Sequence, residues 1–249
     1  MGLSDAGFVV FEADPRVTRW AAAAREAGTA LARDPQVRAA NLRHGETWFV
    51  GVDALPNDAF GAVDGVPLAG PWEDHITAPA TWHAAQLSIV YPGYPAQDPV
   101  ESDANHRFRI TRFAAHVDGL LPEGPARRRY LREPHAFILG LPLNRCAAAP
   151  LMVWPGSQQI MGTALRAAIG DQDPATVDLT DAYQAARRRV FEEIAPQPVH
   201  ATPGQSILLH RHLLHGVAPW AAADTGPSEG RMIAYFRPQT TATRWLSTA

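Results

Sequence analysis

His116 and Asp118 stand two residues apart near the end of the stretch 108–119 and could together bind a metal ion. The alternating apolar residues from Phe108 onward predict a half-buried strand that ends at Gly119. Because side chains two apart in a strand point to the same face, an imidazole and a carboxylate would leave the sheet side by side. A third ligand must then come from elsewhere in the chain.

His215 is the best candidate for that third ligand. It follows the apolar segment 206–214, which predicts a strand, and it precedes a glycine. Two histidines and one carboxylate on one side of a metal, with the opposite side open, form the ligand set of non-haem Fe(II) oxygenases. The alternative is a buried His116 that simply hydrogen-bonds to Asp118. These two residues alone do not show whether they bind a metal or only each other.

Other histidines must be weighed against His215. His210 and His212 share a face of the same predicted strand, so they could form a metal pair of their own. His215 is preferred because a ligand at the end of a strand reaches the mouth of a cavity. Six further histidines stand in loops or polar contexts and are expected to face solvent: His44, His75, His83, His106, His135 and His200.

The composition is that of a globular protein. The 249 residues, 46% of them hydrophobic, are enough for one large domain with a sizeable core. A net charge of −3 gives no indication of nucleic acid or an anionic membrane as a partner. The lone Cys146 cannot form an internal disulfide, which fits a reducing cytoplasm. Residues 1–12 lack the pattern of a signal peptide and no apolar stretch has membrane-spanning length, so we expect a cytoplasmic protein.

Most of the remaining pattern consists of short strands. Asp14-Pro15 is typical of a helix start and precedes an alanine-rich helix from residue 17 to about residue 33, and further helices are predicted over 158–169 and 178–195. Predicted strands cover 8–11 (an edge strand or a docking segment), 47–52, 82–91, 108–118, 136–141, 151–154, 206–214 and 231–237. Many short strands separated by turns favour a mainly β, double-sheet fold with flanking helices, in one domain over 1–249.

Four pieces of sequence between residues 108 and 238 form a recognisable combination. They are His116-Val117-Asp118-Gly119, Val153-Trp154-Pro155-Gly156-Ser157, the segment from Leu209-His210 to His215-Gly216, and Arg231 before an apolar strand. Together they resemble the phytanoyl-CoA dioxygenase family of Fe(II)/2-oxoglutarate-dependent oxygenases. The resemblance implies a double-stranded β-helix (jelly-roll, cupin-like) core that binds Fe(II) through His116, Asp118 and His215 and uses 2-oxoglutarate and O₂. The first 80 or so residues carry little of the likeness.

The resemblance also implies that Arg231 holds the distal carboxylate of 2-oxoglutarate. A planar guanidinium pairs bidentately with a carboxylate and stays charged when buried, so the residue type suits the role. Arg237 has the same parity on the predicted strand, and alternation alone does not choose between the two arginines. Position relative to His215 favours Arg231, whose alternative role is a structural salt bridge.

Related halogenases lack the ligating carboxylate, so with Asp118 present the resemblance implies hydroxylation or desaturation of a small molecule. The sequence departs from the family in two places. Gln158 stands where a histidine usually follows the Pro-Gly-Ser turn, and Trp220 follows Pro219 where a small polar residue is common. Both departures concern the substrate pocket rather than the proposed ligands.

Several residues are candidates for contacts with the co-substrate or the substrate. Gln86 and Ser88 lie on the predicted strand that precedes the His116 motif, and Trp154, His210 and Trp220 complete the set. The loop 120–132 contains four arginines: Arg127, Arg128, Arg129 and Arg132. They form either a solvated charged loop or a binding site for an anionic substrate such as an acyl-CoA.

Two other functional classes stay open at this stage. A cupin-like hydrolase or isomerase would use the same three ligands with zinc or manganese. A non-catalytic barrel would bind a small acid without turning it over. The identity of the small-molecule substrate and the oligomeric state are not encoded in any motif of the sequence.

Overall fold

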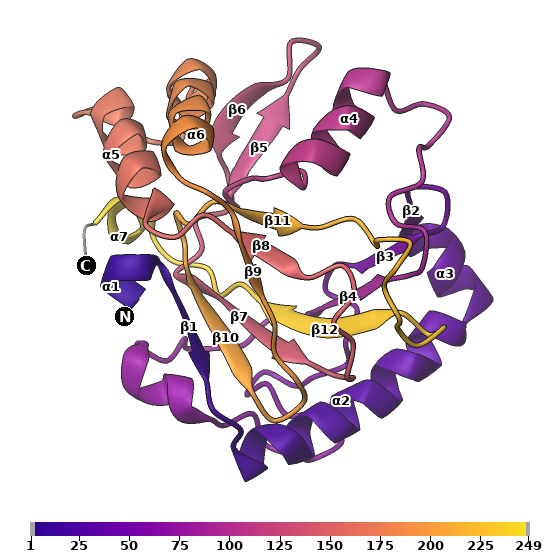
Figure 1. Ribbon diagram of the computed structural model, residues 1–249. Helices are drawn as coiled ribbons and strands as arrows, with labels where there is room; N and C mark the ends of the chain where they lie inside the picture. The colour runs from indigo at the N-terminus through magenta and orange to yellow at the C-terminus, as the bar shows by residue number, and fades with distance from the viewer. Residues whose placement is uncertain (1–2, 248–249) are drawn as a thin grey trace.

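Two antiparallel sheets face each other in this computed structural model, which describes residues 3–247 (Figure 1). The larger sheet contains, in spatial order, β1 (Phe8–Phe11), β10 (Ser206–His210), β7 (Phe137–Pro142), β12 (Arg231–Phe236), β4 (Gln86–Val90), β3 (Trp48–Gly51) and β2 (Leu42–Arg43). The smaller sheet contains β11 (His215–Val217), β8 (Leu151–Val153) and β9 (Gln197–Val199). A separate hairpin pairs β5 (Leu120–Glu123) with β6 (Arg128–Leu131). The predicted double-sheet fold is confirmed.

Apolar side chains that alternate along the strands fill the space between the two sheets. On β12, Ile233 and Tyr235 point inward and pack with side chains of β7, β8 and β10. Met232 and Phe236 point outward, because successive side chains of a strand lie on opposite faces. Arg237, directly after β12, has the inward parity of Tyr235. The strand therefore directs a charged side chain toward the space between the sheets.

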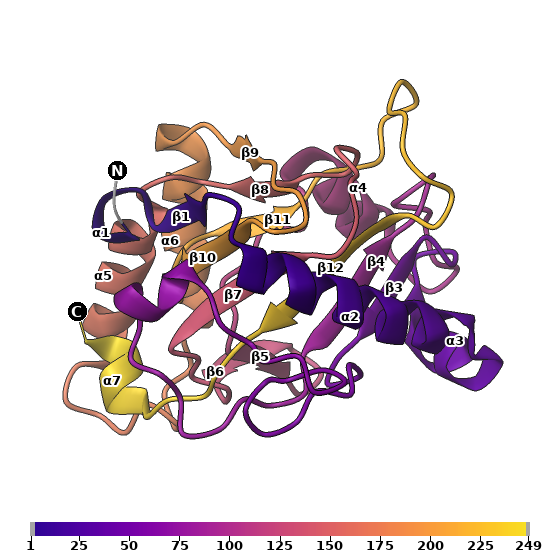
Figure 2. The ribbon, with the colours of Figure 1, turned by 90° about the horizontal axis from the view of Figure 1, so that it is seen from below.

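Helix α2 (Pro15–Arg33) covers the outer face of the larger sheet (Figure 2). It begins as the sequence predicts, since the Asp14 side chain accepts a hydrogen bond from the N–H of Arg16 and Pro15 occupies the first turn. Its Trp20 packs against Phe236 of β12, with ring centroids 5.7 Å apart. The helix thus supports the back of the sheet and leaves the inner face to the cavity described below.

The other helices contact both sheets and the hairpin, and Figure 1 shows α5 and α6 side by side near β6. They are α1 (Leu3–Ala6), α3 (Pro35–Asn41), the 3₁₀-helix η1 (Pro71–His75), α4 (Asp103–Arg112), α5 (Ser157–Ile169), α6 (Thr180–Glu193) and α7 (Ala242–Leu246). Helices α5, α6 and α7 share a core with Trp154 and Trp245. Within residues 3–247, no helix combines the length and the apolar character that a membrane crossing requires.

The predicted strand 108–118 is wrong. The structure has α4 over Asp103–Arg112, and it starts where Ser102 accepts a hydrogen bond from the N–H of Asn105. The left-handed Phe113 ends the helix, and His116 then forms an isolated bridge with β11. The apolar spacing of this segment is compatible with an exposed helix as well as with a strand, and the serine cap decides in favour of the helix.

Three smaller expectations also need correction. The loop expected at 120–132 is the β5–β6 hairpin. The strand expected over 206–214 divides into β10 and, after a turn, the separate strand β11 in the other sheet. Of the strand expected over 82–91, only Gln86–Val90 forms a strand, which is β4. By contrast, β1, β3, β7, β8, β12, α2, α5 and α6 agree with the predicted elements to within a few residues.

Candidate metal centre and cavity

Two backbone hydrogen bonds hold His116 beside His215. The N–H of His116 donates to the carbonyl of His215 at 2.9 Å, and the N–H of His215 donates to the carbonyl of His116 at 3.1 Å. A side chain at Gly216 would place its Cβ only 2.2 Å from the carbonyl oxygen of Phe113, so this close approach of the two segments requires glycine. The short ladder therefore joins two histidines that are distant in the sequence.

The backbone also orients each imidazole. Nδ1 of His116 lies 3.0 Å from the carbonyl oxygen of Ala114, and Nδ1 of His215 lies 2.9 Å from that of Leu213. A carbonyl oxygen only accepts, so Nδ1 carries the hydrogen in both rings and Nε2 keeps its lone pair. The Nε2 atoms lie 3.1 Å (His116) and 3.9 Å (His215) from the carboxylate oxygens of Asp118. This is the tautomer of a metal-ligating histidine whose other nitrogen is fixed by a carbonyl.

Asp118 is ionised and fixed by a neighbouring guanidinium. Nε of Arg237 donates to Oδ2 of Asp118 at 2.6 Å, and Nη1 of Arg237 donates to the side-chain oxygen of Gln86. Burial alone would raise the pKa of Asp118, but the charge of the Arg237 guanidinium holds it well below its usual value. Burial also lowers the pKa of His215 to about 4, which keeps this imidazole neutral at neutral pH. Both groups are therefore in the protonation state of a metal ligand.

We call His116, Asp118 and His215 the Asp118 cluster. Their ligand atoms all lie within 4.8 Å of one another, and within residues 3–247 no other group of histidine, cysteine and acidic side chains converges in this way. Ligand atoms about 2.1 Å from an ion, at right angles to each other, lie about 3 Å apart, so small side-chain rotations would close the cluster on an ion. Two imidazoles and one carboxylate suit Fe(II), Zn(II) or Mn(II). The residues therefore fit a metal.

The cluster lies on the wall of a cavity of about 760 Å³. Gln86 and Ser88, two of the predicted contact residues, line this cavity because they have the inward parity on β4. Nε1 of Trp48 donates to Oγ of Ser88 at 2.9 Å, and this hydrogen bond links the β3 and β4 parts of the wall. Leu151 of β8 and Val217 of β11 supply apolar surface from the smaller sheet.

Arg231 does not line the large cavity. It borders a smaller one, together with Asn144 and Cys146, and Leu151 lines both cavities. The side chain of Arg231 is buried, and its Nε and Nη2 have no hydrogen-bond partner within the described residues. A buried charged donor without an acceptor is unfavourable, so this position suits an anionic ligand. Arg237, the rival from the same strand face, lines the large cavity but is already bound to Asp118.

Three further predicted contact residues do not line the cavity. Trp154 is buried in the core beneath α5 and α6. His210 has the opposite parity to Leu209, which does line the cavity. Trp220 donates its backbone N–H to the carbonyl of Tyr94 and packs in an apolar cluster with Trp48 and Val217, which do line the cavity. The departure of this sequence at Trp220 therefore changes a neighbouring loop rather than the cavity wall itself.

The rival pair His210 and His212 does not assemble an ion site in the described part of the chain. The two rings lie 5.4 Å apart, and Nδ1 of His210 accepts the N–H of His212. The ring of His212 packs edge-on against Trp245. No carboxylate of residues 3–247 converges with this pair as Asp118 does with its two histidines.

Sequence reasoning missed several residues of the cavity wall. His83, Glu133 and His135 all line it, although both histidines were expected to face solvent. His135 is in fact only 7% exposed, so that expectation is wrong. The cause is tertiary: His135 forms an isolated bridge with Gln239, and Nε2 of His83 accepts the backbone N–H of Arg237. No local sequence pattern encodes either contact.

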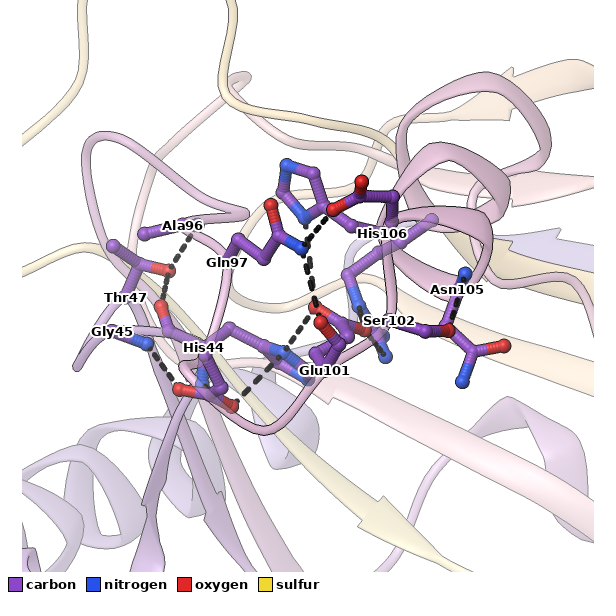
Figure 3. A network of polar contacts seen from close by, with 12 residues as sticks. His44, Gly45, Thr47, Ala96, Gln97, Glu101, Ser102, Asn105 and His106 are labelled. Carbon is purple, nitrogen blue, oxygen red and sulfur yellow. Dashed lines mark hydrogen bonds and ion pairs between the residues drawn. The ribbon is translucent and has the colours of Figure 1, made fainter.

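A second group of histidines surrounds a different carboxylate, between the β2–β3 turn and α4 (Figure 3). Nδ1 of His44 and Nδ1 of His106 lie 3.7 Å and 3.5 Å from Oε2 of Glu101. Nη2 of Arg109 donates to Oε1 at 3.1 Å, and Asp98 accepts the backbone N–H of His44 at 2.9 Å. We call these five residues the Glu101 cluster. The expectation that His44 and His106 face solvent is wrong, since both are half-buried.

Comparisons with known proteins support the fold. No family model matches this sequence, and no curated protein matches it. The non-heme, α-ketoglutarate-dependent carbocyclase SnoK from nogalamycin biosynthesis is similar in structure, with a TM-score of 0.51 at 15% identity over 94% of this chain and 81% of that one. EctD from S. alaskensis, solved with 2-oxoglutarate and 5-hydroxyectoine, has a TM-score of 0.48 at 17% identity over 94% of this chain and 72% of its own. The likeness to SnoK shows a shared fold, and the predicted jelly-roll is confirmed.

Proposed function

We propose that this protein is an Fe(II)- and 2-oxoglutarate-dependent dioxygenase that hydroxylates or desaturates a small molecule. One observation carries the proposal: two imidazoles and a carboxylate converge on the wall of a cavity large enough for a substrate. In this assignment His116, Asp118 and His215 bind the metal on one side, which leaves the opposite side to the co-substrate and O₂.

We assign the distal carboxylate of 2-oxoglutarate to Arg231. The unpaired Nε and Nη2 atoms support this assignment, because one carboxylate would satisfy both. Arg237 is the alternative, but its guanidinium is already bound to Asp118 and Gln86. A metal-dependent hydrolase or isomerase has no need of a buried guanidinium that lacks an acceptor. Arg231 therefore favours the oxygenase over that class.

Bound Fe(II) would couple the decarboxylation of 2-oxoglutarate to succinate and CO₂ with oxidation of the substrate by O₂. The chain's own contribution is preorganisation. The carbonyls of Ala114 and Leu213 fix the two imidazoles, and Arg237 keeps Asp118 ionised and oriented. Apolar wall residues such as Val217 exclude water from the reacting groups. We propose that Gln86 and Ser88 contact the co-substrate or the substrate from the part of the wall formed by β4.

The test is succinate formation from 2-oxoglutarate in the presence of Fe(II), ascorbate and O₂. We expect slow, uncoupled turnover by the wild-type protein, none when zinc replaces iron, and none for His116→Ala. His200→Ala, which changes an exposed histidine, is the matched control and should retain the turnover. Anaerobic titration of the Fe(II) protein with 2-oxoglutarate, followed by visible absorption, gives a readout that needs no substrate. Absence of both succinate and 2-oxoglutarate binding in an iron-loaded protein would overturn the proposal.

A further inference from the structure

Glu133 and His135 form a pair of hydrogen-bond acceptors on the wall of the large cavity. Oε2 of Glu133 lies 3.8 Å from Nε2 of His135, and both residues line the cavity that contains the Asp118 cluster. They lie two residues apart on the segment between β6 and β7. The mechanism outlined above uses neither of them.

The backbone fixes which nitrogen of His135 faces the glutamate as an acceptor. Nδ1 lies 3.1 Å from the carbonyl oxygen of Arg237, which only accepts, so Nδ1 carries the hydrogen. Burial lowers the pKa of His135, so the ring is neutral at neutral pH and Nε2 presents a lone pair. Two acceptors thus face each other with no hydrogen between them. A single bound group with two or more donors could serve both acceptors at once.

The cations on the cavity wall already have partners. Arg237 donates to Asp118, and Nη1 of Arg129 donates to the carbonyl of Leu120 at 3.0 Å while its guanidinium lies over the ring of Tyr183. Within residues 3–247, Glu133 forms no ion pair with an arginine. Its negative charge is therefore left for a group that enters the cavity.

We propose that the substrate carries a protonated amine and that this ammonium group binds between Glu133 and His135. The inference rests on the proposed function, since it names the substrate class of the same cavity. An ammonium group has three donors, so it can serve the carboxylate and the imidazole at once. Its positive charge complements Glu133, which a neutral hydroxyl group would not do. Asp53, which also lines the cavity and lies 3.3 Å from Nδ1 of His83, adds a second negative charge.

An anionic substrate fits this cavity less well, although four arginines occur between residues 127 and 132. Arg128 pairs with Asp178 at 3.4 Å, and Arg132 pairs with Glu123 at 2.5 Å. These contacts hold the β5–β6 hairpin and do not leave a cluster of unpaired guanidinium groups at the cavity. The acyl-CoA class is therefore disfavoured relative to small amines.

The experiment compares matched four-carbon probes: n-butylammonium, butan-1-ol and butyrate. Binding to the protein is measured by calorimetry, both metal-free and loaded with Fe(II) and 2-oxoglutarate without O₂. The variants are Glu133→Gln, Asp53→Asn and Glu192→Gln, which removes an exposed charge on α6 outside the cavity. Because Glu133 is half-exposed, its replacement by the isosteric glutamine should leave the fold intact.

We expect n-butylammonium to bind the wild-type protein about tenfold or more tightly than butan-1-ol, and butyrate to bind least, since hydrogen bonds to charged groups are the stronger ones. Glu133→Gln should abolish this preference, and Glu192→Gln should keep it. Equal binding of amine and alcohol, an unchanged preference in Glu133→Gln, or its loss only in Asp53→Asn would overturn the inference. Iron binding and succinate formation are measured on the same samples, so failure of the proposed function is seen separately.

Discussion

The Asp118 cluster and the Glu101 cluster, both within residues 3–247, are arrangements in which two histidines flank a carboxylate, and they differ in what surrounds them. In the Asp118 cluster the two Nε2 lone pairs point at the carboxylate, the ligand atoms converge, and a cavity of about 760 Å³ begins there. In the Glu101 cluster the ligand atoms do not converge to that degree within the described residues, and the ring of His44 stacks on Trp48 with centroids 5.8 Å apart. The wall of the large cavity includes the Asp118 cluster and none of the five residues of the Glu101 cluster.

The surroundings of the two carboxylates also differ. Asp118 faces two imidazoles whose Nδ1 atoms lie against backbone carbonyls, so both Nε2 atoms are turned toward the carboxylate and can share a cation with it. Glu101 pairs with Arg109 as Asp118 pairs with Arg237, but its neighbour Asp98 caps the turn at His44, and His44 stacks on Trp48. The Asp118 cluster and the Glu101 cluster thus contain almost the same residue types. The cavity volume and the direction of the lone pairs distinguish the Asp118 cluster, a candidate binding site, from the Glu101 cluster, which stabilises the fold.

Asp118→Ala should have the largest effect. It removes the only charged ligand, so we expect Fe(II) affinity to fall by more than about 100-fold, given that loss of an outer partner alone costs 10–100-fold. The measurement is an anaerobic Fe(II) titration. Glu101→Gln is the matched control from the other cluster and should bind iron like the wild type. Equal iron affinity in Asp118→Ala and the wild type would remove the distinction between the two clusters.

Arg231→Leu should have the next largest effect, on co-substrate binding rather than on the metal. Loss of charge-assisted hydrogen bonds worth about 1.5–3 kcal/mol should weaken 2-oxoglutarate binding by about 10–100-fold while iron still binds. Arg25→Leu, which breaks an exposed ion pair with Glu229, is the control and should change neither. If Arg237→Leu weakens 2-oxoglutarate binding and Arg231→Leu does not, the carboxylate partner is Arg237.

The sequence predicts best those features that follow from period-two alternation. The inward parity of Ile233, Tyr235 and Arg237 follows from the pattern of β12, and the structure agrees. That His116 and His215 lie together could be predicted only from the resemblance, because no local rule pairs a residue after α4 with the start of β11. The structure brings these side chains together, and their role as metal ligands stays a prediction.

The rest depended on tertiary contacts that local patterns do not encode. The segment around Phe108 has apolar spacing that suits a strand, but the Ser102 cap and the neighbouring α6 make it a helix, where Arg187 lies over the Phe108 ring. His44 and His135 look like ordinary loop histidines in the sequence. Each is buried by a segment more than fifty residues away, Asp98 for the first and Arg237 for the second.

Glu101→Gln should destabilise the fold without affecting iron binding. The Glu101 side chain is only 9% exposed, and its replacement takes away the charged acceptor of Arg109. We expect the free energy of unfolding in urea to fall by about 1–3 kcal/mol. Glu193→Gln, which breaks an exposed pair with Arg189, should cost no more than about 0.5 kcal/mol. A loss no larger in Glu101→Gln than in this control would mean that the cluster does not hold the structure together.

The smallest effect should be a change in how stability depends on pH. Burial lowers the pKa of His44, with Arg109 acting in the same direction, so the unfolded chain binds this proton more readily than the folded one. The contribution of His44 to stability is therefore complete above its unfolded value of about 6.5 and is lost as the pH falls below it. In His44→Gln the unfolding free energy, measured in urea at pH 7.5, 6.5 and 5.5, should decline less steeply than in the wild type. The exposed His200→Gln controls for the loss of one histidine, and an equal decline in all three proteins would show that His44 is not buried as a neutral ring.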